Sequence, residues 1–168
     1  MTKAIIILGS SRGKGETWNA IQEVIGNQSS IPLIDLNNLS ISPYDYEHSN
    51  QNDDYIPLME KLIAYDLIIL ATPVYWYAMS AQMKIFIDRL SDLLEIRKDL
   101  GRKLRGKKIF ILASFSTSLP KGFEDAFSQT CDYMGMKYLG CSFIYGETDP
   151  ALLETKPNQI TLAKNVMV

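Results

Sequence analysis

The sequence predicts an α/β protein: a three-layer α/β/α sandwich around a five-stranded parallel sheet in the order 2-1-3-4-5. Two observations predict this fold. Five short runs are predominantly apolar, at residues 4–8, 31–36, 67–71, 108–113 and 138–145, as expected of strands buried on both faces. Helical patterns separate these runs, and strands that alternate with helices pair in parallel through crossovers.

The predicted helices are the second kind of element. Apolar residues recur at three- and four-residue spacing in residues 17 to about 27, 56–64, 80–94 and 122–134, and a further helix is expected after Pro157. Two segments interrupt the alternation. Residues 37–55 are polar and include the only histidine, His48, which we expect to be a solvated loop residue without a catalytic role. Residues 95–108 carry seven basic residues.

Length and composition limit the classes of protein. The 168 residues are expected to form a single domain over residues 1–168, with 46% hydrophobic and 21% charged residues. A net charge of -2 argues against a nucleic-acid partner. We find neither a signal segment nor an apolar run of membrane-spanning length, so we expect a cytoplasmic protein without a membrane partner. Cys131 and Cys141 match no zinc pattern, and we expect structural thiols and no metal.

The loop after the first strand, residues 9–17, has the composition of a phosphate site. Gly9 permits a sharp turn, and Ser10 and Thr17 offer hydroxyl groups. Arg12 offers a planar charged fork, and the helix that begins near Thr17 supplies free backbone amides. In a sheet of this order, ligands bind outside the carboxyl ends of the first and third strands. We therefore predict that this first loop binds a phosphate group.

Two other phosphate-handling classes are excluded by the same residues. A Walker loop ends in Gly-Lys-Ser/Thr, whereas this chain has Gly15-Glu16-Thr17. A phosphoacceptor domain needs paired acidic residues after the first strand to hold magnesium, and this loop has Ser-Ser-Arg instead.

Two alternatives stay open. Glycines 9, 13 and 15 do not have the spacing of the dinucleotide fingerprint, but Asp35 ends the second strand where a ribose-binding acid would lie. Alternatively, Ser10 and Thr17 only cap a helix while Arg12 and Lys14 are solvated.

The loop after the third strand, residues 72–80, carries three consecutive aromatic residues, Tyr75, Trp76 and Tyr77. Pro73 restricts its backbone. Backbone amides could bind the pyrimidine edge of an isoalloxazine ring, while an aromatic side chain packs on the face of the ring. The alternative is a hydrophobic connection or a dimer contact, and both interpretations can hold together.

The two loops together resemble a known family. Gly9-Ser10-Ser11-Arg12-x-x-Gly15-x-Thr17, Thr72-Pro73-Val74-Tyr75-Trp76 and Met83-Lys84-x-Phe86-Ile87-Asp88-Arg89 are similar to motifs of the NAD(P)H-dependent FMN reductases, which have the flavodoxin-like fold. The resemblance spans residues 3–118. It implies non-covalently bound FMN, NADPH or NADH as reductant, and a two-electron reductase.

The resemblance also implies the cofactor contacts. The family often has asparagine where this chain has Glu16, a carboxylate that would repel a phosphate unless it turns outward. In the third motif, by contrast, we expect no cofactor contact from Lys84 and Asp88, which are four residues apart and are expected to form an intrahelical ion pair. The implied phosphate contacts are Ser10, Arg12, Gly15, Glu16, Thr17 and Trp18; the implied ring contacts are Pro73, Val74, Tyr75, Trp76 and Tyr77, with Ser114, Ser116 and Thr117 flanking the ring.

The expected function follows from the cofactor. FMN would pass reducing equivalents from NAD(P)H to a small acceptor such as a quinone, free flavin or another electrophile, without a catalytic side-chain acid or base. The alternatives are a flavodoxin-type electron carrier without nicotinamide oxidase activity and a non-catalytic flavin-binding module. The aromatic loop with Met79, and the family's habit of pairing across the flavin, lead us to expect a homodimer or a dimer of dimers.

Overall fold

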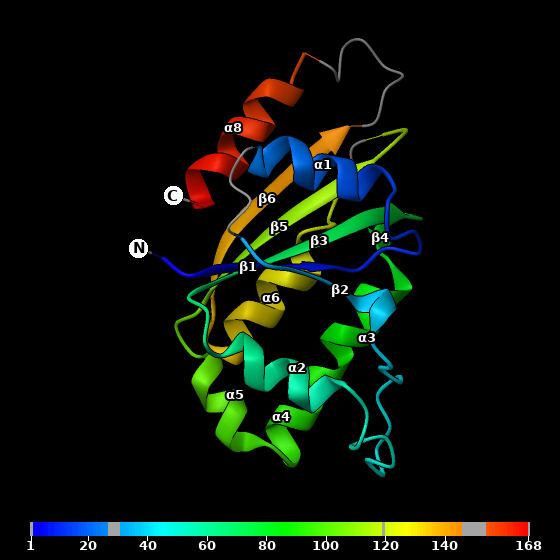
Figure 1. Cartoon of the computed structure of the whole chain (residues 1–168), viewed down its shortest axis with the longest axis vertical. Helices are drawn as coiled ribbons and strands as arrows, with labels where there is room; N and C mark the ends of the chain where they lie inside the picture. Colours follow the sequence, from blue (N-terminus) through cyan, green and yellow to red (C-terminus); the bar gives the residue numbers. More distant parts are fainter. Residues whose placement is uncertain (1, 27–30, 119, 146–153, 168) are drawn as a thin grey trace.

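The predicted parallel sheet is present. The computed structural model describes residues 2–26, 31–118, 120–145 and 154–167. Within them the parallel strands follow the order β2-β1-β3-β5-β6 (Figure 1). Counting parallel strands only, this is the predicted order 2-1-3-4-5, which is confirmed. The strands are β1 (Ala4–Leu8), β2 (Leu33–Asp35), β3 (Leu67–Tyr75), β5 (Lys108–Phe115) and β6 (Lys137–Tyr145).

A short sixth strand was not predicted. Strand β4 (Ala78–Met79) pairs antiparallel with the end of β3, which runs four residues beyond the predicted strand. Val74 pairs with Met79, and Tyr75 pairs with Ala78. Part of the predicted loop of residues 72–80 is therefore a tight β-hairpin.

Helices cover both faces of the sheet, as predicted (Figure 1). Helix α1 (Glu16–Ile25) and helix α8 (Lys156–Met167) pack on one face. The other face carries α2 (Tyr55–Leu62), α3 (Ala81–Asp88) and α6 (Asp125–Met134). The helix predicted over residues 80–94 is divided into α3, the 3-10 turn η2 (Arg89–Ser91) and α4 (Asp92–Glu95). The predicted end of the first helix near residue 27 lies outside the described residues.

The apolar strands supply two cores because successive side chains point to opposite faces. In β1, Ile5 and Ile7 join the core beneath α2, α3 and α6, whereas Ile6 and Leu8 join the core beneath α1 and α8. All four side chains are fully buried. This two-sided burial is why the strands are continuously apolar, and it leaves their carboxyl ends as the place for polar loops.

Helix α5 (Lys98–Leu104) was not predicted, because its charged residues and Gly101 obscure a short helical pattern. A Cβ atom at Gly101 would lie 2.4 Å from the carbonyl oxygen of Leu93, so only glycine allows this close approach of α5 to α4. In the part of the chain that the structure describes, no helix combines the length and apolar character needed to cross a lipid bilayer.

Candidate functional site

The loops after β1, β3 and β5 meet at the carboxyl edge of the sheet, where they line two adjoining hollows. Ser116 belongs to both. The loop hollow is lined by Ser10, Arg12, Gly15, Glu16, Thr17, Pro73, Tyr75, Ser114 and Ser116. The hairpin hollow is lined by Val74, Trp76, Tyr77, Phe115, Ser116, Thr117 and Ser118.

The loop hollow contains the start of helix α1. Gly15 occupies the N-cap position, and no side chain caps this helix end. The first backbone N–H groups of a helix have no acceptor within the helix and favour an anion. Thr17 and Ser114 are both buried, and their hydroxyl groups are hydrogen-bonded at 2.6 Å. The hollow therefore combines free amides with buried hydroxyl groups, a donor set that fits a phosphate.

Two opposite charges flank this hollow. Arg12 is exposed and has no carboxylate within 4.0 Å among the described residues, so its guanidinium group is available to a ligand. Glu16 is exposed at the first position of α1. It also lines a neighbouring depression that contains Glu23 and Lys156. Its carboxylate thus lies at the border of the loop hollow.

Two glycines in the first loop lie close to neighbouring segments. A Cβ atom at Gly9 would lie 3.0 Å from the Met83 backbone nitrogen and side chain. At Gly13 it would lie 2.9 Å from Oδ2 of Asp35. The Asp35 carboxylate also accepts a hydrogen bond from the Asn37 backbone amide at 2.9 Å. Asp35 therefore supports the turn after β2 and lies against the outside of the first loop.

The aromatic hairpin borders both hollows. Trp76 is 94% exposed and Tyr77 is 63% exposed, as the sequence predicts for aromatics at this strand end. Both have positive φ angles, 49° and 65°, which a two-residue turn of this kind demands and which normally favour Asn or Gly. Such strained residues cluster at ligand sites. The Tyr75 hydroxyl is hydrogen-bonded to Ser11 Oγ at 3.0 Å, so the hairpin contacts the first loop.

Two residues of the hairpin hollow were not predicted from the sequence. Phe115 and Ser118 line it together with the predicted residues. The Tyr145 hydroxyl at the end of β6 donates to the Ser116 carbonyl oxygen at 3.0 Å and thereby holds the loop after β5. An apolar run that ends in tyrosine at a carboxyl edge is the signal that could have indicated this contact.

Trp18 is the one predicted site residue that lines neither hollow. Its side chain packs against the core beneath α1 and α8. The other thirteen predicted residues all lie in the two hollows. The sequence therefore identified residues that the fold brings together, although they come from three separate loops.

His48 lies in a loop, as predicted, but the prediction that its side chain is solvated was wrong. Its side chain is only 15% exposed, with Nδ1 3.1 Å from Asp92 and Nε2 2.8 Å from Glu95. Desolvation alone would lower the pKa of His48, but hydrogen bonds to these carboxylates raise it above its ordinary value. Asp92 also accepts from fully buried Arg89 at 2.6 Å, and Arg89 donates to Asp53 at 2.5 Å. This network fastens residues 37–55 to η2 and α4.

Two further predictions hold elsewhere on the structure. Lys84 and Asp88 form the expected ion pair at 2.5 Å. Cys131 and Cys141 are buried free thiols, and burial raises both pKa values, that of Cys131 to about 12. Neither is a reactive thiolate at neutral pH.

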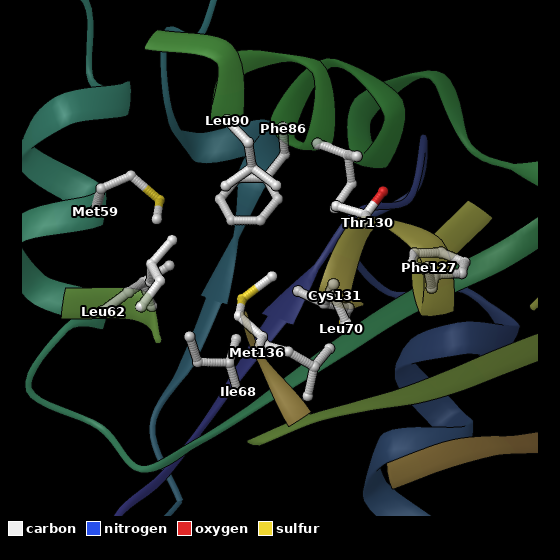
Figure 2. A pocket seen from close by; sticks show the side chains of 13 residues that line it. Met59, Leu62, Ile68, Leu70, Phe86, Leu90, Phe127, Thr130, Cys131 and Met136 are labelled. Carbon is white, nitrogen blue, oxygen red and sulfur yellow. The ribbon is translucent and has the colours of Figure 1, made fainter. Parts of the chain in front are cut away.

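A separate cavity lies within the core between the sheet and helices α2, α3 and α6 (Figure 2). Its lining is almost entirely apolar, and Met59, Phe86, Leu90 and Cys131 surround it. The single hydroxyl group, of Thr130, donates to the Ala126 carbonyl oxygen at 2.6 Å. This cavity offers no polar group to a substrate, so the chemistry of the chain is expected at the carboxyl edge.

The fold is flavodoxin-like, and comparison with known proteins identifies the family. Residues 2–149 match the NADPH-dependent FMN reductase family, so the chain belongs to that family. This confirms the enzyme class predicted from the sequence, an FMN-dependent NAD(P)H oxidoreductase, and favours it over the dinucleotide interpretation.

A curated relative has a name consistent with this assignment, and two solved structures share the fold. A Bacillus subtilis (strain 168) protein, provisionally named NAD(P)H-dependent FMN-containing oxidoreductase YwqN, is 28% identical over 156 residues, which are 86% of this chain and 84% of that protein. The Trp repressor binding protein from Bacillus subtilis is 22% identical, with a TM-score of 0.76 over 99% of this chain and 98% of that one. An FMN-dependent NADH-azoreductase from Bacillus anthracis, solved with FMN, is 9% identical, with a TM-score of 0.70 over 97% and 96%.

Proposed function

We propose that this protein binds FMN across the two adjoining hollows and uses it to pass reducing equivalents from NAD(P)H to a small acceptor such as a quinone, free flavin or another electrophile. One observation carries the proposal. The uncapped start of α1, with Arg12 and buried hydroxyl groups, lies next to an exposed aromatic hairpin. This arrangement fits a ligand with a phosphate at one end and a flat ring at the other.

At the phosphate end, the residues of the first loop act by binding. The free amides at the start of α1 and the Arg12 guanidinium group would donate to phosphate oxygens, and charge-assisted hydrogen bonds of this kind are the strong ones. Thr17 and Ser114 present hydroxyl groups that already hold each other in place. Glu16 lies at the edge, where an outward rotamer would keep its charge away from the phosphate.

At the ring end, the hairpin acts by shape. Pro73 and Tyr75 line the loop hollow, while Trp76 and Tyr77 line the hairpin hollow. Backbone and hydroxyl groups of Ser116 and Thr117 would face the polar edge of the ring, and Tyr145 holds Ser116 in position.

When bound, FMN supplies the hydride and electron chemistry, so the chain needs no side-chain acid or base. The residues of the chain orient the ring, place hydrogen-bond donors where negative charge develops, and leave one face open to the donor and the acceptor. The large exposed surfaces of Trp76 and Tyr77 suit a flat aromatic acceptor. We therefore propose a quinone or a flavin as the acceptor class.

We also propose that the protein forms a homodimer or a dimer of dimers, with the aromatic hairpin at or near the subunit contact. Trp76 is almost fully exposed, and a second subunit would bury it. Light scattering of the FMN-loaded protein at micromolar concentration tests this. A mass of one chain under these conditions would refute the dimer.

Steady-state oxidation of NADH and NADPH by the FMN-loaded protein, with a quinone or free flavin as acceptor, tests the proposed activity. We expect acceptor-dependent turnover, and Trp76→Ala should lower kcat/KM for the acceptor. Tyr133→Ala is the matched control, because Tyr133 is 78% exposed on α6 and lies outside both hollows. FMN binding without nicotinamide oxidation would instead indicate a flavodoxin-type electron carrier.

A further inference from the structure

Two successive carbonyl groups of the first loop are held by side chains from outside the loop. The Ser80 hydroxyl donates to the Gly9 carbonyl oxygen at 2.6 Å. The Asn37 side-chain amide donates to the next carbonyl oxygen, that of Ser10. Ser80 precedes α3, and Asn37 follows β2, so both side chains reach the loop from distant parts of the chain.

The direction of the Ser80 hydrogen bond is fixed by its surroundings. Ser80 is fully buried, and its oxygen accepts a hydrogen bond from the Met83 backbone amide at 3.1 Å as the N-cap of α3. The Ser80 backbone amide in turn donates to Thr72 Oγ1 at 3.1 Å. Because a hydroxyl group has one proton, that proton is directed to the Gly9 carbonyl.

Asn37 is an exposed residue whose backbone is held beside the first loop. Its backbone amide donates to the Asp35 carboxylate at 2.9 Å, which fixes the start of the 3-10 turn η1 (Leu36–Asn38). The same carboxylate lies against Gly13 of the first loop. The end of β2 therefore packs against the first loop, and the Asn37 side chain is placed to reach the Ser10 carbonyl.

Because the peptide bond is planar, these two carbonyl contacts also fix the orientation of two backbone amides. In a trans peptide, the N–H group of the following residue points opposite to the carbonyl group. The Gly9 and Ser10 carbonyl groups point toward Ser80 and Asn37. The N–H groups of Ser10 and Ser11 therefore point away from these two side chains. Within the described residues neither amide donates to an acceptor, whereas the Gly9 amide is engaged by the Ala71 carbonyl at 2.8 Å. Consecutive free amides of this kind form anion-binding concavities.

We propose that Asn37 and Ser80 are positioning residues for the phosphate of FMN, which act by fixing the Ser10 and Ser11 amides toward it. This inference rests on the proposed function. Neither side chain lines the loop hollow, so we expect neither to contact the cofactor itself. Their effect is confined to the phosphate, because the hairpin and the loop after β5 provide the ring contacts.

The test compares FMN with riboflavin, which has the same ring but no phosphate. Asn37→Ala should weaken FMN binding about tenfold, the equivalent of one charge-assisted hydrogen bond, and leave riboflavin binding unchanged. Asn38→Ala is the matched control, since Asn38 is the exposed next residue and its side chain makes no hydrogen bond to any residue that the structure describes. Flavin fluorescence titration measures both affinities. The backbone ¹⁵N and ¹H shifts of Ser10 and Ser11 should respond to FMN in the wild type and respond less in Asn37→Ala.

Ser80→Ala should show the same selective loss, with a lower melting temperature because it also removes the cap of α3. If Ser80→Ala fails to fold, the FMN and riboflavin affinities of Asn37→Ala alone test the positioning role. Equal wild-type affinities for FMN and riboflavin would refute the proposed phosphate site and the positioning role with it. A wild-type preference for FMN that survives Asn37→Ala, or an equal loss for both ligands, would refute the positioning role only.

Discussion

Replacing Arg12 by alanine tests the electrostatics of the first loop. The Arg12 guanidinium group lines the loop hollow without a carboxylate partner among the described residues, and its stem lies over Gly15, 3.3 Å from where a Cβ atom would be. Loss of one hydrogen bond to a charged group costs about 1.5 to 3 kcal/mol, or about ten- to 150-fold in FMN affinity. Because Arg12 is exposed to solvent, we expect the lower part of that range, and a smaller loss at high salt.

Flavin fluorescence titration of the wild type and Arg12→Ala at low and high ionic strength measures this effect. Lys14→Ala is the matched control, because Lys14 carries the same charge in the same loop but does not line the hollow. We expect riboflavin affinity to be the same in all three proteins. An unchanged FMN affinity in Arg12→Ala, or an equal loss in Lys14→Ala, would remove Arg12 from the phosphate site.

Three further predictions concern the charge, the pH dependence and the strain of the structure. Glu16→Gln should tighten FMN binding about two- to fivefold in the same titration. The substitution removes a carboxylate whose electrostatic repulsion with the phosphate costs up to about 1 kcal/mol. Weaker FMN binding by Glu16→Gln would contradict this. The pKa of His48 is raised in the folded state, so its stabilising contribution is present below about pH 6.5 and declines as pH rises through the folded-state pKa. Denaturant unfolding across that range should show this decline in the wild type and not in His48→Gln; identical pH profiles would refute it. Tyr77→Gly should stabilise the cofactor-free protein by about 0.5 to 1 kcal/mol, because glycine accepts a φ of 65° without strain. The same change should reduce turnover, because the hairpin hollow loses an aromatic side chain from its lining. A lower melting temperature of the Tyr77→Gly variant would contradict the predicted backbone strain at Tyr77.

Continuous apolar patterning made the central sheet predictable. In Ile5, Ile6 and Ile7, successive side chains must all be apolar because they enter two different cores. A strand buried on both faces has few other sequence solutions, so its identity and its parallel pairing follow from composition. The loops at the carboxyl edge then follow from the strand order, which is why most predicted site residues lie together.

The hairpin of β3 and β4 was not predictable from local turn chemistry. A two-residue turn with two positive φ angles normally carries Asn-Gly, and here it carries Trp76 and Tyr77. Local preference does not explain this turn, which is flanked by the paired residues Val74–Met79 and Tyr75–Ala78. Aromatic residues in such a turn indicate a binding surface once the backbone is known.

Long-range polar contacts explain the remaining differences between the sequence-based predictions and the structure. His48 was expected to be solvated, but its partners Asp92 and Glu95 are more than forty residues away in the sequence. The same holds for the Asn37 contact with Ser10 and the Ser80 contact with Gly9. Single-sequence patterns report which residues are apolar, and they carry no information about which distant polar groups meet.

A crystal structure of the protein with FMN bound tests the central claim most directly. We expect phosphate oxygens within about 2.7 to 3.2 Å of backbone amides in the first loop and the start of α1, with the ring against Tyr75 to Tyr77. A phosphate bound outside the loop hollow, or a ring that does not contact the hairpin, would contradict it.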